Sequence, residues 1–474
     1  MSDWLITLVD PVETRRRQLA VQELAPLIAW RQELQMLGRL TQPDRRDPTA
    51  FLEWAESEPI LPDNAWILWL ARFGAAATVG IVLLAILRLV PPPVVVFPLI
   101  ANLIIGLWGG HLIGNRVNVA REQHQALKSY SQILRHIDTQ SFSSPLMAEL
   151  LDQLGSRDRP AHLEVSRLGR ITSFAVPRSA ISHFGLQALG NWDIHVLDGL
   201  ERWQQDNGQH VRQWLEIIGT VEALSALAGL AGDNPTWVFP DIDERHTTFD
   251  ATQLGHPLIA ATVRVCNDVH VGPPGTFLLV TGSNMSGKST LLRSIGINIV
   301  LASVGGPCCA HALTTAPFDL WTSVRVTDSL EAGVSFYIAE LLRLKSVYEA
   351  AAVASRQHRP FCYLLDEILQ GTNSAERQIA AREIISRLVG LGAIGAVSTH
   401  DLHLADSPEL AESAVPVHFS DQFSEGPEGM VMSFDYQLRA GVATSTNALN
   451  LMRIVGFEPG DGRTLSADSV RGAI

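Results

Sequence analysis

The chain has 474 residues, of which 46% are hydrophobic and 18% charged, and its formal net charge is −13. This length allows about two to four domains with a large core. The mean hydropathy of +0.14 predicts at least one segment apolar enough to enter a membrane. The negative net charge argues against a protein that binds nucleic acid over its whole surface, because phosphate binding needs clustered lysine and arginine. Four cysteines in so long a chain exclude a disulfide framework and indicate a reducing compartment.

Residues 1–63 are the first predicted region. Leucines at 24, 27, 34 and 37 recur at helical spacing among arginines, which predicts an N-terminal cytoplasmic helical segment. A helix lying on the membrane surface is the alternative, but the arginines form no clean basic face.

Residues 64–115 predict a transmembrane helical hairpin. The stretches 73–87 and 89–115 carry no charge, and three prolines at 91–93 break the helix between them. Helical rise places Arg72 and Arg88 about 24 Å apart, so both can reach the membrane interfaces. The alternative is a hairpin buried in a soluble core.

The flanks of this hairpin predict its topology. Arginines crowd both sides of it, whereas the connecting turn is short, so we expect two spans with the N-terminus and the following domains in the cytoplasm. Small residues at Gly106, Gly110 and Gly114 would allow a neighbouring backbone to approach closely. Trp66, Trp69 and Trp108 are expected at the interfaces.

The rest of the chain divides into two predicted regions. Residues 116–235 read as mostly helical and contain no catalytic cluster, and Gly232 to Pro235 form a loop signal. Residues 236–474 alternate strand-like and helical stretches, as an α/β domain does.

A phosphate-binding loop is the clearest motif. The pattern G-x-x-x-x-G-K-[ST] follows an apolar strand at 277–281 and opens a helix, which is the context that the motif requires. Backbone N–H groups would cradle the phosphates, Lys288 would reach the β and γ phosphates, and the Ser289 hydroxyl would bind Mg²⁺. The predicted nucleotide-binding residues are Gly282, Ser283, Asn284, Met285, Ser286, Gly287, Lys288, Ser289 and Thr290.

Two carboxylates end a second apolar strand, about eighty residues downstream. Asp366 at the carboxyl end of that strand would reach the Mg²⁺ shell beside the phosphate loop. Glu367 is placed to orient and deprotonate the attacking water. A polar loop at 371–374 follows, and a short strand at 394–397 leads to His400, which is placed to contact the γ-phosphate.

Together these motifs resemble the ATPase domain of the MutS family of DNA mismatch repair proteins. The similarity covers about residues 236–458 and includes Gly255-His256-Pro257, Gly333-Val334-Ser335-Phe336 with Glu340, and Tyr436-Gln437-Leu438 followed by Gly441. The resemblance implies an ABC-type α/β ATPase that uses ATP and Mg²⁺. It also implies a homodimer closed over composite sites, in which Ser335 reaches the nucleotide of the opposite subunit.

Several features differ from the family pattern. Residues 1–115 leave no room for the family's mismatch-reading domain, and Ser283 and Ser286 replace the usual proline and glycine. The aromatic platform for adenine, expected within 262–269, has no evident counterpart, which leaves nucleotide selectivity open.

The sequence therefore predicts a membrane-anchored, MutS-like, Mg²⁺-dependent ATPase. The family resemblance implies DNA as a partner, beside a second copy of the chain and the membrane. The alternative is a nucleotide-gated membrane scaffold or mechanical switch that acts on a protein partner without binding DNA. A transporter is disfavoured, since two spans per chain give only four per dimer.

Overall fold

The computed structural model describes residues 4–5, 9–40, 49–61, 64–106, 124–155, 160–177, 180–324, 336–369, 374–400, 407–426 and 429–443. They form two compact units, Met1–Gln18 with Asp233–Ile474 and Leu19–Gly232, here called the sheet unit and the helical unit. The chain passes from one unit to the other within α2 (Pro11–Leu24) and at the end of α11 (Trp192–Asp233).

The helical unit contains no strand among its described residues. Besides the last residues of α2 and nearly all of α11, its helices are α3 (Ile28–Leu40), α4 (Thr49–Glu56), α5 (Ala65–Ile86), the short η2 (Pro92–Val95), α7 (His124–Asp138), α8 (Pro145–Gln153), α9 (Ala161–Ser173) and α10 (Ile181–Gly190). The helical interpretation of residues 116–235 is confirmed for the residues that the structure describes.

Helix α11 is the spine of this unit, with 42 residues and a length of about 60 Å. Trp203 of α11 is fully buried, stacks on Trp54 and donates its indole N–H to the carbonyl of Glu164. The Glu201 carboxylate accepts hydrogen bonds from the backbone N–H groups of Ile60 and Leu61. These contacts fix the segment that leads into α5.

Two apolar helices lie within the segment predicted to form the transmembrane hairpin. Helix α5 ends at Ile86, and after the three prolines the second helix runs from Pro92 to Gly106. Helix α5 is long and apolar enough to cross a membrane, and 11% of its most apolar window is buried. Helix α11 passes the same test of length and composition, but 44% of its window is buried, as in a core helix. Trp108, Gly110 and Gly114 lie outside the described residues.

The sheet unit is built on a six-stranded sheet in the order β12-β9-β4-β8-β7-β6. All neighbours are parallel except the edge strand β12. Its strands are β4 (Phe277–Thr281), β6 (Asp319–Ser323), β7 (Phe361–Asp366), β8 (Ile394–Ser398), β9 (Ala414–His418) and β12 (Arg439–Ala440). The apolar strands predicted before the phosphate loop, the two carboxylates and His400 are thus confirmed.

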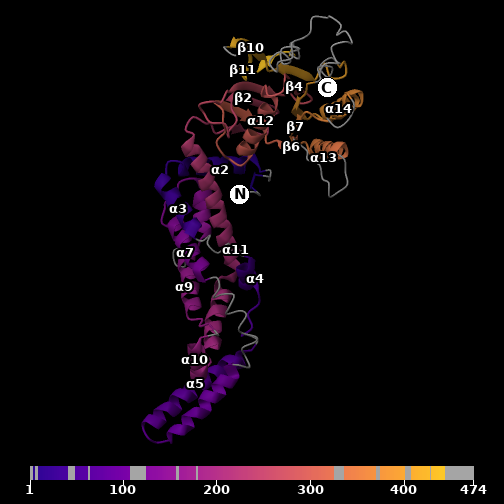
Figure 1. The fold of residues 1–474 in the computed structure, drawn as a ribbon. Coiled ribbons are helices and arrows are strands. Elements are labelled where there is room, and N and C mark those ends of the chain that lie inside the picture. The colour runs from indigo at the N-terminus through magenta and orange to yellow at the C-terminus, as the bar shows by residue number, and fades with distance from the viewer. Residues whose placement is uncertain are drawn as a thin grey trace, which may run out of the picture. The chain divides into compact units, whose positions relative to one another are not determined.

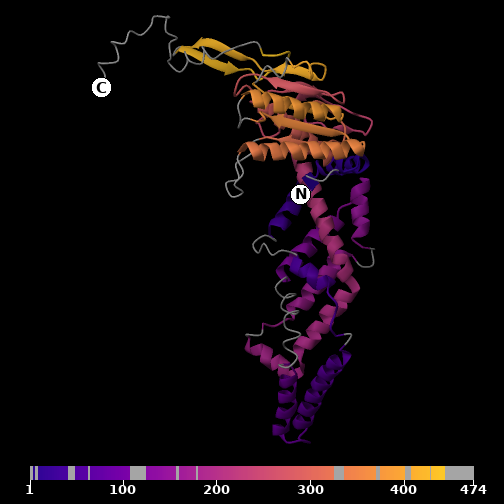
Figure 2. The same ribbon diagram turned by 90° about the vertical axis from the view of Figure 1, so that its right-hand side faces the viewer.

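Helices cover both faces of this sheet (Figure 1, Figure 2). Helix α12 (Lys288–Ser303) packs on one face, and α13 (Phe336–Arg356) and α14 (Ser374–Gly390) pack on the other. A second sheet, in the order β1-β5-β2-β3, adjoins α12 through the same core. Its strands are β1 (Asp241–Ile242), β5 (Ala312–Thr315), β2 (Phe249–Leu254) and β3 (Asn267–Val271), and β10 (Asp421–Gly426) forms a hairpin with β11 (Gly429–Phe434).

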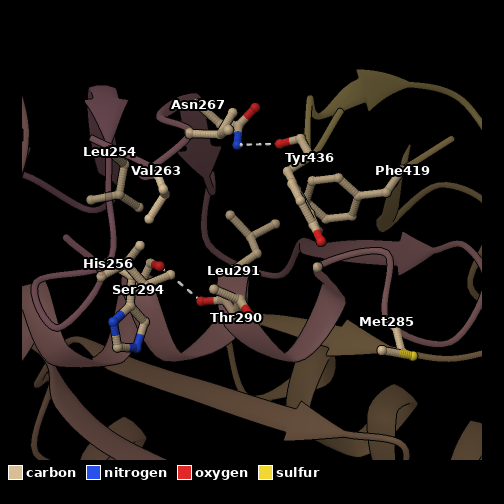
Figure 3. A pocket seen from close by; sticks show the side chains of 13 residues that line it. Leu254, His256, Val263, Asn267, Met285, Thr290, Leu291, Ser294, Phe419 and Tyr436 are labelled. Atoms are coloured by element: carbon tan, nitrogen blue, oxygen red, sulfur yellow. Dashed lines mark hydrogen bonds between the residues drawn. The ribbon is translucent and has the colours of Figure 1, made fainter. Parts of the chain in front are cut away.

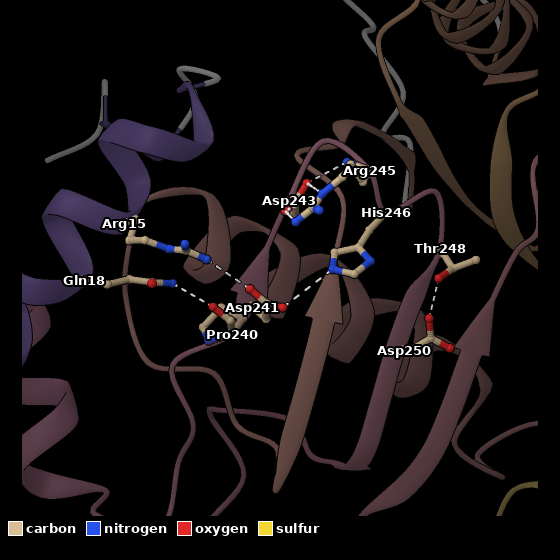
Figure 4. Close-up of polar contacts among 9 residues, drawn as sticks. All are labelled: Arg15, Gln18, Pro240, Asp241, Asp243, Arg245, His246, Thr248 and Asp250. Atoms are coloured by element: carbon tan, nitrogen blue, oxygen red, sulfur yellow. Dashed lines mark hydrogen bonds and ion pairs between the residues drawn. The ribbon is translucent and has the colours of Figure 1, made fainter.

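The first turns of α2 belong to the sheet unit. Thr14 donates to the carbonyl of Ser303, and Gln18 donates to the carbonyl of Pro240. Arg15 forms an ion pair of 3.2 Å with Asp241 (Figure 4). Residues 11–18 therefore pack on a domain whose remaining residues begin more than two hundred positions later.

Candidate nucleotide site

Strand register assembles the site. Asp366 of β7 is paired with Ser398 of β8, and Ser398 is paired with Val280 of β4, one residue before the strand's end. Because the three strands are parallel, the phosphate loop, Asp366 and the residues after Ser398 meet at one edge of the sheet. This is where ligands bind in open α/β sheets.

The phosphate loop has the backbone of an anion cradle. Gly282 and Gly287 have backbone φ values of +142° and +114°, which residues other than glycine rarely adopt. A Cβ at Gly282 would lie 2.8 Å from the Ser286 hydroxyl. Gly287 caps α12, so the positive end of that helix faces the loop.

Lys288 lies in the first turn of α12 and is almost fully buried. Its Nζ donates to the carbonyls of Gly282 (2.9 Å) and Ser283 (2.7 Å) and lies 3.6 Å from Glu367 Oε1. Burial lowers the pKa of Lys288, and the nearby Glu367 opposes that shift. The ammonium is thus held inside the loop where phosphate oxygens would bind.

An oxygen cluster lies next to this lysine. Ser289 Oγ donates a 3.0 Å hydrogen bond to Asp366 Oδ1, and Ser398 Oγ donates to the same carboxylate oxygen. A hydroxyl and a carboxylate in contact match the hard oxygen ligands of Mg²⁺, which takes few protein ligands and completes its shell with water and phosphate. The residues predicted to bind the metal, Ser289 and Asp366, therefore fit it.

Glu367 has a left-handed backbone, with φ of +49°. Its N–H is held by the carbonyl and hydroxyl of Ser398, each at 3.1 Å. One carboxylate oxygen faces Lys288, and the other lies 3.1 Å from His400 Nε2. The three residues predicted to be catalytic are thus brought together.

Ser283 and Ser286, the two departures in the loop, occupy different surroundings. Ser283 Oγ donates to Asp421 at the start of β10 (2.5 Å). Ser286 is buried, with its hydroxyl against Gly282.

A pocket of about 410 Å³ opens beside the phosphate loop (Figure 3). Val263 and Val265 line it within the segment where an aromatic platform was expected, but aromatic rings come from elsewhere, from Phe419 and Tyr436. The Asn267 side chain holds the Tyr436 segment by donating to the Tyr436 carbonyl (3.0 Å) and accepting from the Leu438 N–H (2.7 Å). The motif at 436–438 is recognisable in the sequence, but nothing in it predicts that the Tyr436 ring lines this pocket.

His256 lines the same pocket from the motif Gly255-His256-Pro257. Its Nδ1 accepts a hydrogen bond from the N–H of Leu258 (3.2 Å), which requires that nitrogen to be unprotonated. Burial, with Arg293 and Arg264 nearby, lowers the pKa of His256.

The remaining predicted residues lie partly outside the described chain. Ser335, the residue expected to act in trans, and the loop at 370–373 are not among the described residues. Glu340 is described, and its buried carboxylate accepts a 2.7 Å hydrogen bond from the N–H of Leu369.

Comparison with known proteins gives one family. Residues 278–459 match the model of MutS domain V. The chain is 28% identical to the DNA mismatch repair protein MSH3 of Vanderwaltozyma polyspora and 26% identical to MSH6 of Arabidopsis thaliana, over 51% and 52% of this chain. It is 29% identical to MutS 2 of Halobacterium salinarum over 42% of this chain. The alignments span 20–24% of the length of these relatives.

Proposed function

Because its C-terminal region matches MutS domain V, the chain belongs to the MutS family, and we propose that it is a membrane-anchored ATPase that hydrolyses ATP to ADP and phosphate. The observation that carries the proposal is the hydrogen bond from Ser289 to Asp366. It joins the helix that follows the phosphate loop to the strand that directly precedes the proposed base.

Hydrolysis would proceed by in-line attack of water on the γ-phosphorus. Glu367 accepts the proton of this water as the new O–P bond forms, and the bond to the β-phosphate oxygen breaks. Lys288 turns from the loop carbonyls to the β and γ phosphate oxygens, and His400 donates to the γ-phosphate. The 3.1 Å contact between His400 and Glu367 supports placing both at the transferred group.

Ser289 and Asp366 would hold Mg²⁺, which when bound neutralises charge on the phosphate oxygens. The adenine base would enter the pocket beside the loop and stack against Tyr436, which lines the pocket and is 43% exposed. Thr290 also lines that pocket, which supports its place among the nucleotide-binding residues.

A homodimer with Ser335 acting across the interface completes the proposed site. The support is the family relationship, since the signature loop of the family serves the opposite subunit. ATP binding would then close the two sheet units over two nucleotides.

The membrane anchor is supported by the surface of the hairpin. Trp66, Trp69, Phe73, Leu83 and Phe97 are all exposed, and Phe97 is 74% exposed. So large an apolar surface is rare on soluble monomers and suits hydrocarbon. We assign two spans, with the sheet unit in the cytoplasm where ATP is available.

The macromolecular partner has two candidates. DNA is favoured by the relatives, which are named as DNA mismatch repair proteins. A protein partner, moved or gated by the ATPase, is favoured by charge: residues 116–235 hold 11 lysines and arginines against 13 aspartates and glutamates. Arg202 and Arg212 there are engaged by Asp198 and Glu56.

The decisive experiment measures the ATPase rate of detergent-solubilised protein with and without duplex DNA carrying a mismatch, a branch or neither. Stimulation that weakens as salt rises would identify DNA as the partner. Steady turnover that no DNA alters, with no DNA retained at low salt, would leave the protein-directed switch. No turnover with Mg²⁺ and ATP would refute the ATPase proposal itself.

A further inference from the structure

Helix α10 buries polar side chains and exposes apolar ones, the reverse of what a helix on the surface of a soluble protein does. Its polar side chains His183 and Gln187 are buried, whereas Ile181, Phe184 and Leu189 are exposed, Ile181 by 91%. The helix carries no aspartate, glutamate, lysine or arginine. In water, the opposite distribution is favoured.

The buried side of α10 joins a connected polar layer. His183 Nε2 lies 3.0 Å from Asp193 Oδ2 and 3.1 Å from Gln187 Nε2. Asn191, which ends α10 in a left-handed conformation, donates to Asn102 Oδ1 (3.1 Å). Asn102 in turn donates to Thr78 Oγ1 (2.9 Å) and to the carbonyl of Ala188 (3.0 Å).

This layer fastens α10 to the hairpin at close range. A Cβ at Gly190 would lie 2.9 Å from Ala75 Cβ, and one at Gly106 would lie 3.0 Å from Gln187 Oε1. Small residues at helix contacts with amides bonded across them are the pattern of helix packing in membranes. Figure 1 shows α10 beside α5.

The position along the hairpin matters as well. Gly74, Ala75 and Thr78 follow Arg72, which pairs with Asp198 of α11 at 3.5 Å. The C-terminal end of α10 therefore meets α5 on the uncharged side of that ion pair. Leu189, next to Gly190 at this contact, is exposed, as are apolar residues of the hairpin.

We propose that α10 is a third membrane-embedded element, whose Ile181, Phe184 and Leu189 face lipid acyl chains beside the hairpin. In hydrocarbon, apolar side chains face outward and polar side chains turn toward the protein interior, which is the arrangement described above. The anchor would then be a hairpin with a short helix packed against its cytoplasmic half, rather than two spans alone. This inference rests on the proposed membrane anchor.

The test is spin labelling of single cysteines in the full chain, reconstituted in nanodiscs of phosphatidylcholine and phosphatidylglycerol. The background is Cys266→Ser, because Cys308, Cys309 and Cys362 are buried. Labels are placed through Ile181→Cys and Phe184→Cys on α10 and through Leu83→Cys on the hairpin. Ile379→Cys on α14, an exposed apolar residue of the sheet unit, is the matched control. Unchanged ATPase rates would establish that the labelled chains are folded.

At each site we would measure how often the spin label collides with oxygen, which concentrates in lipid, and with a water-soluble nickel chelate. The ratio of the oxygen rate to the nickel rate at Ile181 and Phe184 is expected to match that at Leu83 and to exceed that at Ile379 several-fold. Values at α10 that match Ile379 while Leu83 lies in lipid would overturn this inference and leave the anchor intact. Shielding from both reagents would mean that protein covers α10 and would overturn it too. Values at Leu83 that match Ile379 would refute the membrane anchor itself.

Discussion

The carboxylate of Glu340, in the second turn of α13, accepts a 2.7 Å hydrogen bond from the backbone N–H of Leu369, two residues after Glu367. Helix α13 begins directly after Ser335, the residue expected to reach the partner's nucleotide. One hydrogen bond thus ties the start of the proposed dimer contact to the loop that carries the proposed base.

Glu340→Ala should lower both the thermal midpoint and the ATPase rate. It leaves the buried Leu369 N–H without its acceptor, which costs about 1–3 kcal/mol. Glu340→Gln keeps an acceptor oxygen and should retain most of both, as measured by calorimetry and phosphate release. Equal losses in the two variants would argue that the charge, not the hydrogen bond, matters.

Glu367→Gln should bind ATP as the parent does but turn over roughly 100- to 10,000-fold more slowly, since the amide cannot accept the proton of water. Phosphate release and a fluorescent nucleotide titration separate the two effects. Normal turnover by this variant would remove Glu367 as the base.

Lys288→Ala should weaken ATP binding by roughly 10- to 100-fold, the usual range for a hydrogen bond to a charged group. ADP should be affected less, because it lacks the γ-phosphate that this lysine is expected to contact. Lys345→Ala, on the exposed side of α13, is the matched control. Equal affinity for ATP in both variants would refute the role of Lys288.

Tyr436→Ala should weaken nucleotide binding by about 1–3 kcal/mol, the range for stacking between a base and an aromatic ring. Tyr436→Phe should bind normally, because the ring rather than the hydroxyl makes the contact. A titration with ATP and with triphosphate lacking the base checks this. The base-free ligand should bind both variants equally.

His256 should make stability depend on pH. Its pKa is lowered by burial, so the unfolded chain binds the extra proton first as pH falls below about 6.5. The stabilisation is complete above that value and declines between it and the lower folded pKa. Denaturant midpoints from pH 8 to 5 should fall more steeply for the parent than for His256→Gln. Parallel curves would contradict the assignment.

The phosphate loop and the strand ends could be predicted because their signals are local. A glycine pattern between an apolar strand and a helix predicts where Lys288 and Ser289 lie. An apolar strand likewise predicts the position of Asp366 at its carboxyl end. Parallel pairing then brings them together at one edge of the sheet.

Other parts of the site depend on contacts between distant residues. Tyr436 reaches the pocket through Asn267, 169 positions earlier, and no periodicity encodes that pairing. Ser283 likewise finds Asp421 across 138 positions. The inward polar face of α10 was missed because an uncharged ten-residue helix is too short to register as a membrane segment.

The docking of residues 11–18 on the sheet unit has a consequence for biosynthesis. The ribosome makes this segment first, but its partners Pro240, Asp241 and Ser303 emerge only after the whole helical unit. The sheet unit therefore cannot complete its folding early in translation, and residues 11–18 remain without these partners until the later residues are made. An ATPase fragment begun at residue 236 would lack this segment and would leave the carbonyls of Pro240 and Ser303 without these donors.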